Sequence, residues 1–118
     1  MANRKPRPKA NSTETNNAIE TNISFGFERK GNTLIVKLTG EADLSGSSAL
    51  RQALVRKLDG IDNVIFDLGK LEFADSYFLR LLIKLRKRLG GVSSVKVRNA
   101  KPNVRRIFEV TNLDKLFI

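Results

Sequence analysis

The sequence predicts a single α/β domain built on a mixed β-sheet with helices packed against it, in the order β-β-α-β-α-β-α-(β). Three observations support this fold class. The chain has 118 residues, enough for one domain, and 41% of them are hydrophobic, enough for one core. Two strand-like segments come first. Strand-like and helix-like segments then alternate, as in sheets whose strands are joined by helical crossovers.

The first 22 residues differ in composition from the rest of the chain. Asn, Thr, Lys, Arg and Pro dominate residues 1–22, and almost no apolar side chain there is available for burial. We therefore expect a disordered basic and polar tail over residues 1–22 and one domain over residues 23–118.

We expect the domain to open with a β-hairpin. Apolar side chains occupy every second position in two neighbouring segments, namely Ile23, Phe25 and Phe27, then Leu34, Val36 and Leu38. The Lys-Gly-Asn sequence at residues 30–32 lies between them and is a turn signal. Two alternating segments joined by such a turn are typical of antiparallel neighbours.

A surface helix is predicted after the connecting segment at residues 40–45. Apolar residues recur at helical spacing at Leu50, Ala53, Leu54 and Leu58, with basic residues outside this stripe. Candidate N-cap residues are Ser45, Ser47 and Ser48. The Asp-Gly pair at residues 59–60 is expected to end the helix.

A short central strand is predicted at Val64-Ile65-Phe66, because a segment that is apolar on both faces suits a buried position in a sheet. We expect the chain to leave this strand at Asp67, and Leu71 and Phe73 to fold back against the core.

A second helix should begin near Ser76 and end at the glycine pair 90–91, because glycine favours the left-handed conformation that closes a helix. Its apolar stripe comprises Phe78, Leu81, Leu82, Leu85 and Leu89.

The last quarter of the chain predicts a strand, a helix and an apolar end. The strand is marked by Val92, Val95 and Val97, and the helix by Pro102, Val104, Ile107 and Phe108. Asn112 stands where a left-handed residue is expected. The apolar end at residues 113–118 either docks on the domain or continues as a last strand.

The composition argues against an enzyme. The chain has no Cys and no His, which removes the commonest general base, the commonest metal ligand and the usual activated nucleophiles. Carboxylates at Asp43, Asp67 and Asp75 can approach one another where strands meet helices, but acidic residues at such places more often cap helices than catalyse. We predict no catalytic residues, no metal and no cofactor.

The chain is predicted to be cytoplasmic. No apolar run approaches the roughly 18–20 residues that cross a bilayer, so we expect no membrane insertion. The positive N-terminus is not followed by the apolar segment of a secretory signal. The absence of Cys fits a reducing compartment.

The most informative residue is Ser76, which follows Asp75 at a helix start. From the residues alone, a simple helix start is the commoner explanation, because either side chain can accept a hydrogen bond from the first turn. The alternative is a phosphorylation site. A phosphate adds about −1.5 to −2 charges, which the helix N-terminus tolerates but a partner packed over the same place does not.

Basic residues are concentrated in one part of the chain. The formal net charge is +10, and ten Lys or Arg but no Asp or Glu lie from Arg80 to Arg106. On one helix face lie Arg80, Lys84, Lys87 and Arg88, with Arg86 nearby. This face is either solvated or the contact for an acidic partner. Nucleic acid is disfavoured, because Trp is absent, the Phe residues are mostly expected in the core, and no DNA-reading motif is present.

At residues 64–68 and 71–76 the chain resembles the signature of the STAS domain (sulfate transporter and anti-sigma-factor antagonist). Residues 40–45 look like that family's Gly-Glu-Leu-Asp-Leu-Ser segment. Residues 102–108 and 113–117 resemble its closing helix and the segment that follows. The resemblance covers about residues 23–118.

The resemblance implies a function in transcription regulation by partner switching. Bacterial members of this type are anti-sigma factor antagonists, which bind an anti-sigma factor, usually a serine kinase, and so release the sigma factor. The kinase phosphorylates the serine that maps to Ser76, and a phosphatase reverses this. The partner-binding residues are then expected to be Asp43, Asp75, Ser76, Tyr77, Arg80 and Lys84.

The chain departs from the family pattern after Ser76. Tyr77 and Phe78 replace small residues, so the kinase should dock differently from the usual one; stressosome scaffold members also carry a bulky residue here. The bulky residue therefore does not abolish the switch. The alternative function is a constitutive scaffold subunit, which uses the same fold without phosphorylation. The chain also ends at Ile118, before a C-terminal helix that many members have, which can leave apolar surface for a partner or for self-association.

Overall fold

The computed structural model describes residues 21–118, and the predicted disordered tail lies almost entirely outside this part of the chain. The elements, in order, are β1 (Ile23–Lys30), β2 (Thr33–Ala42), α1 (Leu44–Val55), β3 (Asn63–Ala74), α2 (Ser76–Leu89), β4 (Val95–Arg98), α3 (Pro102–Val110) and α4 (Asp114–Phe117). The predicted mixed α/β fold is confirmed. Within the described range, no helix is long and apolar enough to span a membrane.

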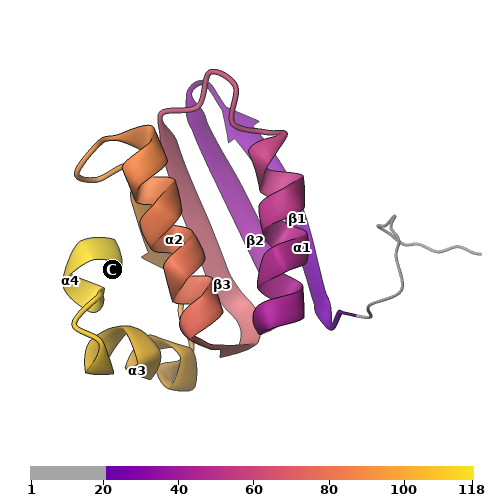
Figure 1. Ribbon diagram of the computed structural model, residues 1–118, viewed down its shortest axis with the longest axis vertical. Helices are drawn as coiled ribbons and strands as arrows, with labels where there is room; N and C mark the ends of the chain where they lie inside the picture. Colours follow the sequence, from indigo (N-terminus) through magenta and orange to yellow (C-terminus); the bar gives the residue numbers. More distant parts are fainter. Residues whose placement is uncertain (1–20) are drawn as a thin grey trace, which may run out of the picture.

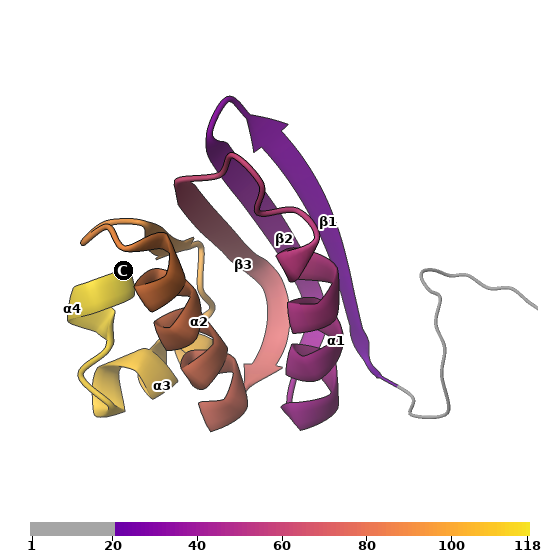
Figure 2. The same cartoon turned by 45° about the horizontal axis from the view of Figure 1, so that its top comes forward.

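The four strands form one sheet in the order β1-β2-β3-β4 (Figure 1). The predicted hairpin is confirmed: β1 pairs antiparallel with β2, and Gly31 takes the left-handed conformation in the turn. The pairs β2/β3 and β3/β4 are parallel. Because β2, β3 and β4 follow one another across the sheet, two crossovers of the same hand place α1 and α2 on the same face (Figure 2).

The core lies between the sheet and these two helices. Each inner strand contributes alternate side chains to it, and α2 contributes five buried side chains, Phe78, Leu79, Leu81, Leu82 and Leu85. Phe66 of β3 meets Phe78 edge to face, with ring centres 6.0 Å apart. Helix α2 has its predicted bounds, and Gly90 ends it with a φ of 82°.

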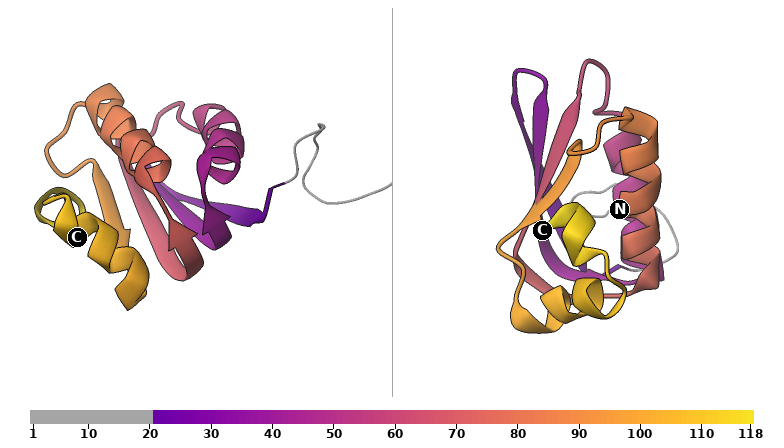
Figure 3. Two further views of the ribbon diagram at one scale, coloured as in Figure 1. Left: turned by 60° about the horizontal axis from the view of Figure 1, so that its bottom comes forward. Right: turned by 90° about the vertical axis from the view of Figure 1, so that its left-hand side faces the viewer.

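The apolar C-terminal end docks on the domain, which is one of the two alternatives that the sequence predicts. It does so as the short helix α4 and not as a last strand, so the strand alternative is wrong. Phe117 is fully buried and packs edge to face on Phe108 of α3, with ring centres 6.2 Å apart. Asn112 takes the predicted left-handed conformation between the two helices, at a φ of 62°. Figure 3 shows α3 and α4 together beside the β4 edge of the sheet.

Strand β3 is much longer than predicted, because it keeps pairing with β2 beyond Asp67. The register goes from Lys37↔Asp67 to Thr39↔Lys70, which leaves one extra residue on β3, and a second extra residue lies at Glu72. Each such bulge reverses the alternation of inward and outward side chains. As a result Leu71 is buried as predicted, but Phe73 is 45% exposed and does not fold back against the core.

Two other boundaries differ from the prediction. Helix α1 ends at Val55, before Asp59, and Arg29 of β1 holds the following loop by donating hydrogen bonds to the carbonyls of Asp59 and Gly60. Val92 lies in the turn before β4 and is 78% exposed, because the strand begins only at Val95.

Candidate functional site

The candidate site lies where β2 and β3 end together. Ala42 and Ala74 are register partners at the ends of these parallel strands. The Asp75 N–H donates to the Ala42 carbonyl oxygen across 3.4 Å, so the residues that follow the two strands are neighbours. The helices α1 and α2 consequently begin side by side at one end of the sheet (Figure 1).

Each of these two helices is capped by an aspartate. The Asp43 carboxylate accepts from the Gly46 N–H at 2.8 Å, and the Asp75 carboxylate accepts from the Tyr77 N–H at 3.0 Å. A side chain at Gly46 would collide with the carbonyl oxygen of Glu41, so glycine permits this tight entry into α1.

The predicted serine caps of α1 are therefore wrong. The helix begins at Leu44, one residue before the first of these serines, because the aspartate carboxylate already satisfies the first turn. Ser47 is instead buried, and its hydroxyl lies 3.5 Å from the carbonyl oxygen of Ala42.

Ser76 is the first residue of α2, and it is exposed. Asp75, not Ser76, is the N-cap, so the serine hydroxyl is not required to close the helix. The helix N-terminus offers a positive dipole end next to it. An added anion at Ser76 would therefore meet a favourable local potential.

Three large apolar side chains are exposed at the end of the domain where this helix starts, and we call Leu44, Phe73 and Tyr77 the apolar rim. These side chains are 55%, 45% and 43% exposed, respectively. Leu44 begins α1, Phe73 stands near the end of β3, and Tyr77 lies in the first turn of α2, so all three are at the same end of the domain. Exposed large apolar side chains grouped in this way are typical of interaction sites.

Basic side chains continue this surface along α2. The guanidinium carbon of Arg80 lies 5.8 Å from the centre of the Tyr77 ring, in the geometry of a cation–π contact. Lys84 follows one turn later, and both cations are exposed.

The structure thus brings the six residues expected to bind a partner to the paired helix starts and the outward face of α2. The sequence did not predict that Leu44 and Phe73 would be exposed at this end of the domain. Leu44 belongs to a helix whose start was placed too late, and Phe73 is turned outward by a bulge that has no signal in the sequence.

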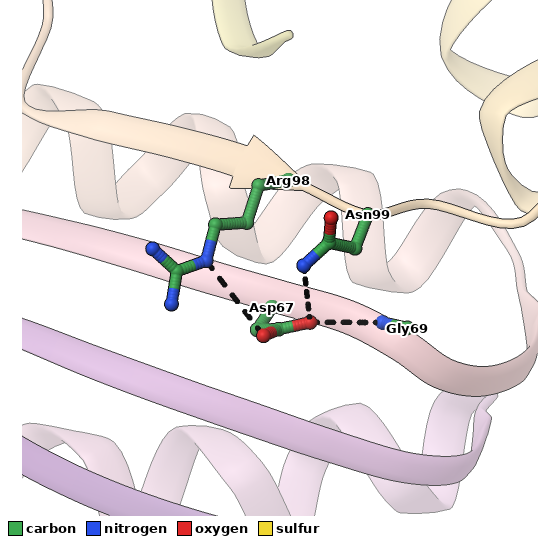
Figure 4. Close-up of polar contacts among 4 residues, drawn as sticks. All are labelled: Asp67, Gly69, Arg98 and Asn99. Atoms are coloured by element: carbon green, nitrogen blue, oxygen red, sulfur yellow. Dashed lines mark hydrogen bonds and ion pairs between the residues drawn. The ribbon is translucent and has the colours of Figure 1, made fainter.

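Asp67 does not join the other two carboxylates. It lies on the face of the sheet opposite α1 and α2, where it accepts hydrogen bonds from the Gly69 N–H at 3.1 Å and the Asn99 amide at 3.2 Å (Figure 4). Arg98 forms an ion pair with it at 3.7 Å. Asp67 therefore ties β3 to the turn after β4, in which Asn99 has a φ of 62°.

The pKa of Asp67 is lowered by this arrangement. Partial burial acts to raise the pKa, but the hydrogen bonds from Gly69 and Asn99 and the charges of Arg98 and Lys37 together outweigh it. Among residues 21–118, no group of three His, Cys, Asp or Glu side chains is placed to hold a metal ion.

Comparison with known proteins supports a relationship over almost the whole described chain. Residues 25–118 match a family model described as "Mlab, STAS domain". A STAS-domain-containing protein of Pseudomonas aeruginosa (strain UCBPP-PA14) is 28% identical over 74% of this chain and 87% of its own length. BtrV of Bordetella bronchiseptica, named as an anti-sigma factor antagonist, is 31% identical over 71% of this chain and 74% of its own length.

Solved structures show the same fold. An anti-sigma factor antagonist from Mycobacterium paratuberculosis is 30% identical and superposes with a TM-score of 0.68, covering 80% of this chain and 82% of its own. The unphosphorylated form of the anti-sigma factor antagonist SpoIIAA is 22% identical and superposes with a TM-score of 0.69, covering 80% of this chain and 86% of its own.

The cap of α2 leads to a first prediction. Replacing Asp75 by Ala removes the hydrogen bond to Tyr77 N–H, so the free energy of unfolding should fall by about 1 kcal/mol. Asp75→Asn keeps an acceptor oxygen and should retain most of that stability. Urea denaturation of the three proteins measures both effects. Equal losses in the Ala and Asn variants would mean that capping is not the role of this side chain.

The lowered pKa of Asp67 leads to a second prediction. Because the carboxylate is favoured in the folded state, its contribution to stability is present above its unfolded pKa of about 4 and is lost as the pH falls through the folded pKa. Asp67→Asn should cost about 1 kcal/mol at pH 7. This cost should shrink as the pH falls below about 4, as followed by urea denaturation from pH 7 to pH 3.

A matched control for Asp67 is Glu109→Gln, which removes an exposed i,i+4 ion pair with Arg105. Such pairs contribute about 0.5 kcal/mol or less. A difference between wild type and Asp67→Asn that stays constant over the whole pH range would show that the charge of Asp67 is unimportant for folding.

Proposed function

We propose, from the premise that this chain belongs to the STAS family, that it is an anti-sigma factor antagonist controlled by phosphorylation of Ser76. In this proposal it binds an anti-sigma factor with serine-kinase activity when Ser76 is unmodified, and releases it when Ser76 carries a phosphate. A phosphatase restores binding. The protein acts by binding and carries out no reaction itself.

One observation supports the proposal above all others. Ser76 is exposed in the first turn of α2, at the same end of the domain as the apolar rim and beside an aspartate that already caps the helix. The serine is thus available for chemistry without loss of a helix cap. A partner that covers Tyr77, the neighbour of Ser76 in the first turn, would also cover Ser76.

The same placement explains why a phosphate would act on binding and not on folding. In the free protein, a phosphate on Ser76 stays in water and next to the positive end of the helix dipole. In the complex it would lie under the partner, where a charge without partners is costly. A loss of about 3 kcal/mol corresponds to roughly 150-fold weaker binding.

Tyr77 sets a condition on the enzyme that modifies Ser76. Its ring is 43% exposed and stands directly after the serine, so a kinase must reach the hydroxyl past a bulky side chain. We therefore expect the kinase to contact the Tyr77 ring, in place of the close backbone approach that a small residue allows.

Binding by Ser76 variants tests the switch. Titration calorimetry should use each recombinant anti-sigma factor serine kinase encoded in the same genome. At least one should bind wild type and Ser76→Ala with similar Kd values, and bind Ser76→Asp about 100-fold more weakly. Ser93→Asp is the matched control, because Ser93 is exposed but lies in the turn before β4. Equal affinities for Ser76→Asp and wild type would refute the switch.

Arg80 leads to a separate prediction about the phosphorylated protein. It stands four residues after Ser76, so their side chains are neighbours on the helix surface. A phosphate on Ser76 should draw the guanidinium away from the Tyr77 ring. The dianion is then stabilised, and the second pKa of the phosphate should lie below its usual value of about 6.

A ³¹P NMR titration of protein with phosphoserine installed at position 76 measures that pKa. Arg80→Gln should raise it, whereas Arg88→Gln, two further turns along α2, should leave it nearly unchanged. An identical titration curve for the Arg80 variant and its parent would show that Arg80 does not bind the phosphate.

A further inference from the structure

The two helices that cover the sheet carry charge of only one sign. Together α1 and α2 contain six Lys or Arg residues and no Asp or Glu. Five of the six are on α2, and four of these form what we call the basic ridge on its exposed surface: Arg80, Lys84, Lys87 and Arg88. The ion pairs found within residues 21–118 include no residue of α2.

The opposite face of the sheet is different. It carries both signs, and its central acidic residue, Asp67, is paired with Arg98. The net positive charge of the protein is therefore not spread evenly over the described domain. Its uncompensated part is concentrated on the side that also carries the candidate site.

Stabilisation of the helix explains the presence of only two of the four ridge residues, Lys87 and Arg88. Arg86, Lys87 and Arg88 lie in the last turn, where cations interact favourably with the helix dipole. Arg86 also donates to the Val92 carbonyl oxygen at 3.2 Å and so holds the following turn.

Neither the helix dipole nor a loop contact explains Arg80 and Lys84, and the contact of Arg80 with the exposed Tyr77 ring leaves its charge without an acidic partner. Arg80 lies near the positive end of the dipole, and the two like charges at i,i+4 spacing repel each other. Within residues 21–118, neither forms an ion pair.

The position of these two cations points to a protein surface. They continue the line of Ser76 and Tyr77 along the outward side of α2, so a partner that covers Ser76 and Tyr77 also meets them. A nucleic acid would find no row of aromatic residues on this helix for base stacking, whereas a protein surface can set Asp or Glu side chains against these cations and apolar side chains against Tyr77.

We propose that the partner of this site is an acidic protein surface, which places a strip of Asp or Glu side chains along the basic ridge next to an apolar contact with the rim. This inference rests on the proposed function for the location of the partner. It adds the chemistry by which that partner is recognised, and a second way in which phosphorylation acts.

That second way is neutralisation of charge. A phosphoserine at position 76 brings about two negative charges to the near end of the ridge. They compete with the partner's carboxylates for Arg80 and weaken the attraction along α2. Binding to an acidic strip should also weaken with salt, because the Debye length falls from about 10 Å at 0.1 M to about 3 Å at 1 M.

The test uses a defined acidic probe. A 15-residue synthetic peptide with four Glu at i,i+4 spacing beside a Leu/Phe face is titrated into ¹⁵N-labelled protein, and amide shifts are followed. Shifts should concentrate on residues 76–88, and the affinity should fall several-fold between 50 and 300 mM NaCl. The Glu→Lys version of the peptide should not bind. A 20-base-pair DNA and phosphatidylserine vesicles are the competing probes, and tighter binding of either at 150 mM NaCl would overturn the proposal.

Charge-reversal variants assign the effect to the ridge. Arg80→Glu with Lys84→Glu should weaken peptide binding at least tenfold, whereas Arg105→Glu with Arg106→Glu, an equal charge change at exposed positions on α3, should change it less than twofold. Equal losses in the two double variants would overturn the proposal. Arg80→Gln with Lys84→Gln should give an intermediate loss, which keeps the test decisive if the reversed variant does not fold.

Measurements of kinase binding distinguish this inference from the proposed function. If Ser76→Asp weakens kinase binding but reversal at Arg80 and Lys84 does not, the acidic-surface proposal fails and the switch stands. If reversal weakens binding of the peptide and the kinase while Ser76→Asp binds the kinase like wild type, the switch fails and the acidic surface stands.

Discussion

The site depends on one constraint, the parallel pairing of β2 and β3 up to a common end. Because Ala42 and Ala74 are register partners, the two chains leave the sheet at the same level. The crossovers have the same hand, so both chains turn to the same face and begin helices side by side. Asp43 and Asp75 then become neighbouring caps, and the exposure of Ser76 follows from strand length, with no flexible loop involved.

The two bulges in β3 determine what surrounds that serine. A strand with regular alternation would turn every second side chain inward, so one extra residue at Glu72 changes which of its neighbours is buried. With the bulge, Ala74 fills the narrow space at the strand end and Phe73 turns outward. The apolar rim is therefore partly a product of register, and its position next to Ser76 depends on pairing with a strand more than thirty residues earlier.

This distinction explains what could be predicted from the sequence. The hairpin turn, the end of α2 at Gly90 and the left-handed Asn112 were predictable because each depends on the conformational preference of one or two residues. The placement of the α2 residues that are proposed to bind a partner was predictable, because helical spacing alone puts them on one face. The length of β3 and the exposure of Phe73 were not, because they are decided by pairing across the sheet. The cap of α1 was misplaced because three nearby serines are equally plausible by composition.

The charges of α2 connect binding and release in the proposed function. A helix N-terminus attracts anions, and Arg80 adds a cation one turn away, so the neighbourhood of Ser76 favours negative charge from any source. A partner's carboxylates and a covalently attached phosphate would compete for the same positively charged place beside Ser76. The attached phosphate has the advantage, because it loses no translational freedom on binding. A basic residue near the proposed phosphorylation site can therefore strengthen the complex before modification and weaken it afterwards, which a neutral small residue at that position cannot do.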